Sequence, residues 1–287
     1  MLGSLVGVLF DGLAYGMLLF LLSVGLSVTL GMMNFVNLAH CSFAMVGGYM
    51  TVSLMNEFGW PFLATLPLAF IAAAAISVVL ERALYRHLYR RSDLDQCLLT
   101  IGIVFISIAA YAWFYGTVVQ STEMPGYLTG AVELFGVRFA AYRLFLIVMG
   151  LAVAAILVLG LERTRFGAQV RAAVDNQRMA RGLGIDVDRA FMITFALGGG
   201  LAGLGGALSI AMVGLDHAFA LNYLVYVLIV VAVGGLGSIG GSFAAAVLLG
   251  MSDMAGKYYF PWLGAFLIYL VMVALLIWRP VGLFGRR

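Results

Sequence analysis

The sequence LFLIVMGLAVAAILVLGL, at residues 144–161, decides the fold class of this chain. None of these residues carries a charge or a polar side chain. About 20 apolar residues cross the hydrocarbon core of a bilayer as an α-helix. A strand of a membrane β-barrel instead alternates apolar and polar residues over about ten positions. The stretch therefore predicts a membrane-spanning helix, and residues 191–211 form a second long apolar run.

The composition extends this prediction to the whole chain. Of its 287 residues, 64% are hydrophobic and only 10% are charged, whereas a soluble domain carries about 25% charged residues. The apolar segments predict spans at residues 2–30, 38–55, 61–80, 97–118, 142–161, 190–213, 222–235, 241–255 and 260–278. Two of these segments, 222–235 and 241–255, are short for a full crossing. They flank a glycine cluster, which indicates that one or both are tilted or broken.

The expected fold is therefore all-α. The sequence predicts a polytopic membrane protein, a bundle of about 8–9 transmembrane helices with a broken or re-entrant segment, in a single transmembrane domain over residues 1–287.

The arginines predict the orientation. Three stretches, 81–96, 162–189 and the tail from residue 279, hold 13 of the 15 arginines. Short cytoplasmic loops are the loops enriched in basic residues, so all three are expected on the cytoplasmic face. Two predicted spans separate the first pair and four the second, as a shared face requires. Three spans precede residue 81, which predicts an external amino terminus and a cytoplasmic carboxyl terminus.

The external loop at residues 120–142 is long. It contains the turn Pro125-Gly126 and then alternates apolar and other residues through Val132 and Phe139. This pattern favours a short structured lid on the outer surface; a plain connector is the alternative.

The predicted spans hold few charged residues, and Asp11 and Asp253 come nearest to being exceptions. Proton relays and voltage sensors place ionisable side chains inside the membrane, and the sequence predicts neither. The closest approach to a phosphate-binding loop, from Gly250 to Lys257, has five residues between its glycines instead of four and no serine or threonine after the lysine. The chain is not expected to be an enzyme or to bind ATP, so active transport would draw its energy from elsewhere.

No catalytic residue and no metal site are predicted. The two cysteines, Cys41 and Cys97, lie in or beside apolar runs and suit small buried residues. The net charge of +3 does not indicate a nucleic-acid partner, because membrane topology accounts for the arginines.

A polar interruption at residues 31–40 is the first candidate for function. It separates two apolar spans and is polar but uncharged. Irregular backbone at membrane depth is tolerated where it is buried in protein or lines a cavity. A broken helix there would present Asn34, Asn37 and His40, and a helix amino terminus that favours a carboxylate. The alternative is an ordinary interfacial turn.

Two glycine-rich stretches are the second candidate. In residues 198–206, small residues recur at four-residue spacing, which predicts a helix-packing face. Residues 234–241 are too dense in glycine for a comfortable helix, because each glycine costs about 1 kcal/mol relative to alanine. This second stretch predicts a turn or re-entrant bend that contains Gly237 and Ser238.

The cytoplasmic loop at residues 162–189 is the third candidate. Phe166, Val170, Ala173 and Val174 form one apolar stripe on a short predicted helix. The pair at residues 175–176 can end this helix and cap a second turn.

The same loop contains its own stop signals. Gly182 and Gly184 end the second turn, and Asp186 or Asp188 can cap the next span. A loop of this length offers a docking surface for a cytoplasmic partner; a helix lying on the membrane surface is the alternative.

Together these stretches resemble the LivH-type permease subunits of branched-chain amino acid ABC importers. The resemblance rests on elements that occur in the family's order over nearly the whole chain: Met33-Asn34-Phe35 with Ala39-His40, Tyr142-Arg143-Leu144-Phe145, Arg171-Ala172-Ala173 through Ala180 to Leu183-Gly184-Ile185-Asp186, Gly234 to Gly241, and Arg279 to Gly285. In this chain Val36-Asn37-Leu38 separates Phe35 from Ala39, so the first element is an altered match. Most elements are weak alone, and their ordered combination is strong.

The resemblance implies a division of labour. It implies a second LivH/LivM-type permease subunit, two cytoplasmic ATPases that bind the ATP, an external solute-binding protein, and a place in a bacterial-type inner membrane. The loop would transmit the motion of the ATPases through Phe166, Val170, Arg171, Ala173, Asp175, Ala180, Leu183, Gly184 and Asp186. The expected substrate pathway contains Asn34, Phe35, Asn37 and His40, with Gly237 and Ser238 secondary.

Other functions stay open from the sequence. A stand-alone facilitator or sodium-coupled carrier would use the broken polar segment and the glycines but leaves the long cytoplasmic loop unexplained. A membrane scaffold leaves residues 34–40 unexplained. Branched-chain amino acids are the substrates that the resemblance implies, and similar proteins also carry urea, amides and aromatic acids.

Overall fold

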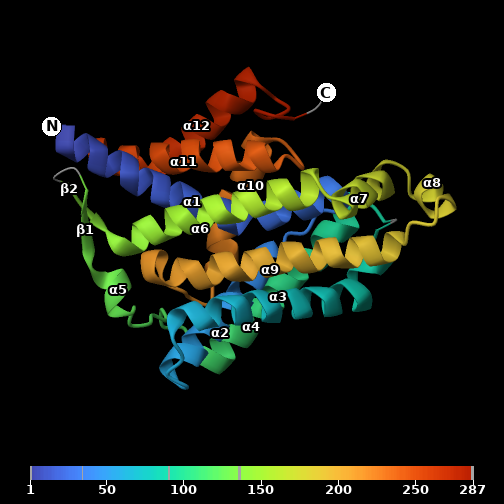
Figure 1. Ribbon diagram of the computed structural model, residues 1–287, viewed down its shortest axis with the longest axis horizontal. Coiled ribbons are helices and arrows are strands. Elements are labelled where there is room, and N and C mark those ends of the chain that lie inside the picture. Colours follow the sequence, from blue (N-terminus) through green and yellow to red (C-terminus); the bar gives the residue numbers. More distant parts are fainter. Residues whose placement is uncertain (1, 34, 90, 135–136, 286–287) are drawn as a thin grey trace.

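Each of the nine predicted apolar segments corresponds to a helix in the computed structural model, which describes residues 2–33, 35–89, 91–134 and 137–285 (Figure 1). These helices are α1 (Leu2–Met33), α2 (His40–Asn56), α3 (Phe62–Ala83), α4 (Asp93–Tyr115), α6 (Ala141–Leu157), α9 (Val187–Val213), α10 (Phe219–Gly234), α11 (Ile239–Tyr259) and α12 (Gly264–Trp278). The smaller elements are η1 (Tyr85–His87), α5 (Gly126–Thr129), β1 (Ala131–Leu134), β2 (Val137–Ala140), η2 (Val158–Glu162), α7 (Arg165–Asp175) and α8 (Gln177–Gly182). The prediction of an all-α polytopic membrane protein is confirmed.

Helix length separates two groups among the described residues. Six helices, α1, α3, α4, α6, α9 and α11, are long and apolar enough to cross a membrane, and α10 and the apolar part of α12 are shorter. The sequence underestimated segment 241–255, because α11 has 21 residues. It runs beyond Asp253 because the ammonium of Lys257, one turn later, pairs with that carboxylate at 2.6 Å.

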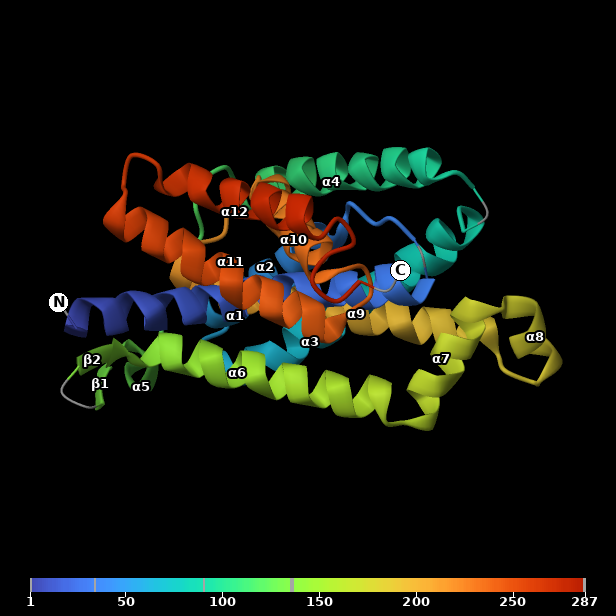
Figure 2. The same ribbon diagram turned by 90° about the horizontal axis from the view of Figure 1, so that it is seen from above.

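The two ends of the bundle carry different structures (Figures 1 and 2). The amino-terminal end of α1 lies at the same end as α5 and the β1–β2 hairpin, which we call the hairpin end. The turn between α3 and α4 lies at the opposite end together with α7 and α8, which we call the α7–α8 end. The basic stretches 81–96 and 162–189 thus lie at the same end, as the arginines predicted.

Glycines allow α9 to lie against three other helices. A Cβ atom on Gly206 would collide with the carbonyl oxygen of Ala44 in α2, and one on Gly203 would collide with Ala73 in α3. A Cβ atom on Gly25 of α1 would likewise collide with the carbonyl oxygen of Gly198. Small residues permit this close approach between membrane helices, so the predicted packing face at 198–206 is confirmed.

Helices α1 and α11 form a second glycine contact. A Cβ on Gly16 would lie 2.8 Å from the carbonyl oxygen of Ala246, and one on Gly12 would lie 2.7 Å from the Cα of Met251. The hydroxyl groups of Ser27 and Ser242 are 2.5 Å apart and share a hydrogen bond. This pair fixes the start of α11 against the last two turns of α1.

A non-helical segment at residues 35–39 joins α1 to α2, which confirms the predicted break. The side chains of α4 satisfy its backbone: the Val36 N–H donates to Gln96 at 3.0 Å, and the Leu38 N–H donates to the hydroxyl of Thr100 at 3.2 Å. Buried backbone donors need such partners. The segment is therefore irregular backbone buried in protein.

Candidate functional site

The segment α7–α8 is built from its own capping residues. The hydroxyl of Thr164 accepts from the Gly167 N–H at 3.3 Å and starts α7. Val170 and Ala173 are fully buried, whereas Phe166 is half-buried. Asn176 ends α7 and caps α8 by accepting from the Met179 N–H at 3.0 Å. The predicted stripe and the predicted cap are both confirmed.

The end of this segment is fixed to α9. Gly184 has a φ of 81°, a left-handed conformation that glycine adopts at little cost. The carboxylate of Asp186 accepts from the Arg189 N–H at 3.0 Å and starts α9. Arg181 and Asp188 form an ion pair of 2.8 Å, and Ala180 is buried in a small cluster with Val187 and Phe191. Asp186, not Asp188, is therefore the cap.

The outward face of the segment combines apolar and basic groups. Met179 and Leu183 are 66% and 78% exposed. Arg178, which precedes Met179 in α8, is also exposed. Exposed apolar side chains rimmed by charges are typical of protein interaction sites. Leu183 was among the predicted coupling residues, but Met179 was not, because it lies outside the apolar stripe of α7 and no sequence pattern marks it.

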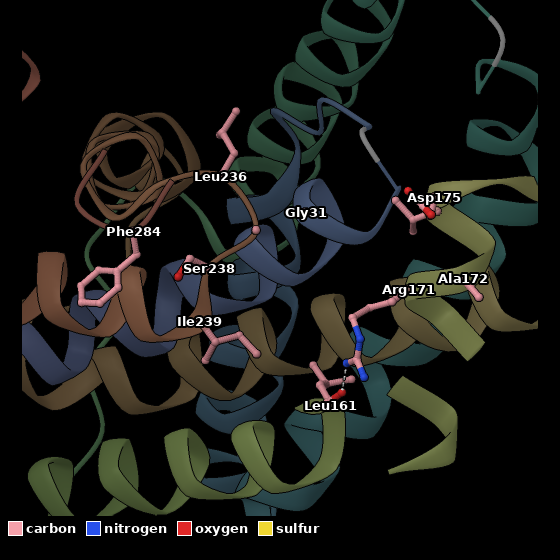
Figure 3. A pocket seen from close by; sticks show the side chains of 11 residues that line it. Gly31, Leu161, Arg171, Ala172, Asp175, Leu236, Ser238, Ile239 and Phe284 are labelled. Atoms are coloured by element: carbon pink, nitrogen blue, oxygen red, sulfur yellow. Dashed lines mark hydrogen bonds between the residues drawn. The ribbon is translucent and has the colours of Figure 1, made fainter. Parts of the chain in front are cut away.

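A cavity of about 1060 Å³ lies between α7 and the turn that joins α10 to α11. Arg171 and Asp175 line one side, and Ser238 and Ile239 line the other (Figure 3). Gly31 near the end of α1 and Phe284 of the tail also line the cavity, and Figure 3 labels both. Arg171 and Asp175 were predicted to couple the permease to the ATPases, and Gly237 and Ser238 were predicted to line the substrate pathway. All four residues line the same cavity.

Arg171 holds α7 against the end of α6. Its guanidinium donates to the backbone carbonyl of Leu161, at the end of the π-helical turn η2 (Figure 3). Gly167 contacts the same carbonyl so closely that a Cβ atom there would collide with it. Movement of α7 would therefore move the end of α6.

The opposite wall is a glycine turn, as predicted for residues 234–241. Gly235 and Gly237 have φ values of 95° and 78°, and Ser238 caps α11 by accepting from the Gly241 N–H at 3.0 Å. A Cβ on Gly237 would lie 2.6 Å from the Cα of Gly31, so the turn lies directly against the end of α1. The tail covers the end of α10 through the Leu283 N–H, which donates to the Val233 carbonyl at 2.7 Å.

The remaining predicted pathway residues lie elsewhere. Asn34 lies outside the described residues. Phe35 is buried against Tyr85, with ring centroids 5.2 Å apart, and His40 is buried with its Nε2 donating to the Leu22 carbonyl at 3.1 Å. The buried side chain of Asn37 caps the Ala39 N–H at 3.1 Å. Phe35, Asn37 and His40 line neither of the two cavities described here, and their role in transport stays a prediction.

A hydrogen bond between two side chains lies beside Phe35 at the α7–α8 end of the bundle. The hydroxyl of Tyr89 donates to the buried carboxylate of Glu81 at 2.8 Å, and its ring lies edge-on to Phe35. Burial, and then the hydrogen bond to Glu81, raise the pKa of Tyr89 above its ordinary value. The hydroxyl therefore stays protonated and continues to donate at physiological pH.

The two acidic residues that come nearest to lying inside the predicted spans are both paired. Asp11 forms an ion pair with Arg143. Asp253 is only 1% exposed in the interior of α11, and it pairs with Lys257. The ammonium of Lys257 also lies 5.5 Å from the ring centroid of Tyr15. Like the carboxylate of Glu81, that of Asp253 is thus buried in the described part of the chain, which composition alone did not reveal.

A second cavity, of about 530 Å³, lies near the hairpin end between the end of α9 and the face of α10. Its polar lining was not predicted from the sequence and comprises Asp216, Asn222, Tyr223, Tyr226 and Tyr269. The available signal was the pair Asp216-His217 between two apolar spans, followed by tyrosines at helical spacing.

A bundle of apolar helices packed through glycines, with a basic two-helix protrusion at one end, defines a multi-pass membrane protein. Residues 8–276 match the family described as the branched-chain amino acid transport system, permease component. The chain belongs to this family.

Its relatives match over most of their length. The chain is 29% identical to the probable branched-chain amino acid transport permease protein LivH of Methanocaldococcus jannaschii, over 97% of this chain and 92% of that protein. It is 25% identical to the high-affinity branched-chain amino acid transport system permease protein BraD of Pseudomonas aeruginosa, over 97% and 95%. It is also 26% identical to the corresponding permease LivM of Escherichia coli K12, over 93% of this chain and 68% of that protein.

Proposed function

We propose that this chain is the transmembrane permease subunit of an ABC importer that moves branched-chain amino acids, or related small polar solutes, into the cell. The printed functions of the relatives support this substrate class. Two cytoplasmic partner subunits bind and hydrolyse the ATP, a second LivH/LivM-type permease completes the pore, and an external binding protein delivers the solute. The membrane is the inner membrane of a bacterial-type cell.

The α7–α8 segment is the observation that carries the proposal. Its inner face anchors it to the bundle through Val170, Ala173 and Ala180, while Met179 and Leu183 extend outward. A facilitator that works alone has no need for such a surface. An ATPase that binds these side chains would transmit its motion to the permease.

The packing contacts of α7 supply the path for that motion. Arg171 connects α7 to the turn η2 that follows α6, and α7 also packs against α1 and α9. A displacement of α7 therefore reaches several helices of the bundle at once. We infer that this displacement opens the pore alternately to the two sides.

The orientation follows from the arginines. The α7–α8 end, which carries the basic stretches 81–96 and 162–189, faces the cytosol under the positive-inside rule. The hairpin end and the amino terminus then face the exterior, where α5, β1 and β2 offer a surface that the binding protein can contact.

Co-purification tests the proposal. The affinity-tagged chain, co-expressed with the genes that adjoin its own and extracted in mild detergent, is expected to recover an ATPase subunit and a second permease at comparable stoichiometry. Recovery of the tagged chain alone, from membranes in which the ATPase is also present, would contradict the proposal.

A further inference from the structure

The cavity near the hairpin end has the size of a small-molecule site. Its volume of about 530 Å³ falls within the range of about 300–1,000 Å³ that is usual for ligand pockets. Its described lining combines five apolar side chains with five polar ones. The apolar side chains are Val119, Val213, Phe219, Leu221 and Val225.

One face of α10 supplies an aromatic wall. Phe219, Tyr223 and Tyr226 recur at helical spacing, and Tyr269 of α12 extends the row. The rings of Phe219 and Tyr223 are stacked with centroids 4.4 Å apart, and those of Tyr226 and Tyr269 are stacked at 6.3 Å. Stacked tyrosines present electron-rich faces that attract a cation.

Asp216 supplies the only unbalanced charge in the described lining of this cavity. Within the described part of the chain, its carboxylate takes part in none of the ion pairs and accepts no side-chain hydrogen bond. The neighbouring charges are already balanced, because Asp253 pairs with Lys257 and Asp11 pairs with Arg143. A half-buried carboxylate without a partner is costly, which a cationic ligand would offset.

The backbone holds Asp216 in place. The N–H of Gln120, after α4, donates to the Leu215 carbonyl at 2.7 Å, and the Leu215 N–H donates to the Gln120 carbonyl at 3.2 Å. Gly214 ends α9 with a φ of 74°. Beside this turn, two buried polar atoms, the hydroxyl of Tyr49 and Nδ1 of His217, have no hydrogen-bond partner among the described residues. The backbone next to Asp216 is thus tied to the segment after α4, and unused hydrogen-bonding groups lie beside it.

We propose that this cavity binds the ammonium group of an amino acid on its way through the permease, with Asp216 as its counter-ion and the tyrosines of α10 and α12 around it. The amide of Asn222 donates to the carboxylate, and the side chain lies against Phe219 and Leu221. The proposal rests on the proposed function and narrows it, because such a site accepts zwitterionic or cationic amines and rejects urea and neutral amides.

Direct binding tests this proposal. The intact importer complex, in nanodiscs and without its binding protein, is dialysed against radiolabelled L-leucine, and 4-methylpentanoate and 3-methylbutylamine serve as competitors. The first competitor lacks the ammonium group and the second keeps it. We expect 3-methylbutylamine to displace leucine at a concentration about tenfold or more below that required of 4-methylpentanoate.

Variants locate the site. Asp216→Asn is expected to weaken leucine binding about tenfold or more, and Asp216→Glu is expected to restore part of it. Glu123→Gln, which removes an exposed carboxylate of the same external region, should leave binding unchanged.

Three outcomes would overturn the proposal: no leucine binding to the unaltered complex, equal competition by the two analogues, or unchanged binding by Asp216→Asn. The comparison of analogues needs no variant and so holds even if Asp216→Asn does not fold. Each of these outcomes leaves the proposed function standing, since co-purification with an ATPase tests that separately.

Discussion

Replacing Gly206 by alanine is expected to lower the thermal unfolding midpoint of the purified protein by about 6–12 °C. The added methyl group would collide with the carbonyl oxygen of Ala44, so α9 and α2 must separate along their whole contact. Overpacking a tight interior costs about 1–3 kcal/mol, and here we expect the upper end because backbone meets backbone. In a chain of this size each kcal/mol corresponds to about 2–4 °C.

Gly102→Ala is the matched control. Gly102 also lies within a membrane helix, α4, but a Cβ atom there meets nothing within 4 Å. Alanine favours a helix by about 1 kcal/mol over glycine, so this variant should unfold at the same temperature or slightly higher. Equal midpoints for the two variants, measured by fluorescence in the same detergent, would refute the glycine-mediated packing of α9.

Replacing Leu183 by serine is expected to reduce the ATPase activity stimulated by the binding protein at least about tenfold. Leu183 is 78% exposed, so its removal leaves the packing of this chain nearly unchanged. An apolar anchor at the centre of a protein interface contributes about 2 kcal/mol or more to binding, which corresponds to a loss of this size. The measurement is phosphate release by the complete complex in proteoliposomes.

Leu94→Ser controls for the loss of an exposed leucine at the same end of the bundle. Leu94 is 68% exposed in the first turn of α4, away from α7 and α8, and its replacement should leave the stimulated activity intact. If Leu183→Ser retains full activity and full recovery of the ATPase, the outward face of α8 takes no part in coupling.

The helices and their ends could be predicted because local signals decide them. Apolar runs locate the spans, and Asn176 and Asp186 mark helix starts by chemistry that depends only on nearby residues. The glycines of α9 were predicted to pack because their four-residue spacing places them on one face. The length of α11 was underestimated because hydropathy treats Asp253 and Lys257 as charges that end a span. In the structure Lys257 pairs with Asp253 and contacts the ring of Tyr15, so the helix continues past both residues.

The sites depend on contacts between distant segments, so the sequence predicted less of them. Arg171 and Ser238 were both singled out, yet only the fold places them on the same cavity. Asp216 was missed because its importance comes from the absence of a counter-ion and from tyrosines that α10 and α12 bring together. Phe35 and His40 were predicted to line the pathway because they belong to the polar interruption at residues 31–40. In the structure, backbone N–H groups of this interruption donate to the side chains of Gln96 and Thr100.

Uptake by the reconstituted system tests the central claim most directly. Proteoliposomes that contain this chain, its partner permease and both ATPases are loaded with ATP and given the binding protein with radiolabelled L-leucine outside. We predict accumulation against a gradient that stops when the internal ATP is replaced by a non-hydrolysable analogue. Accumulation of leucine by vesicles that contain this chain alone, without ATPases or ATP, would contradict the account.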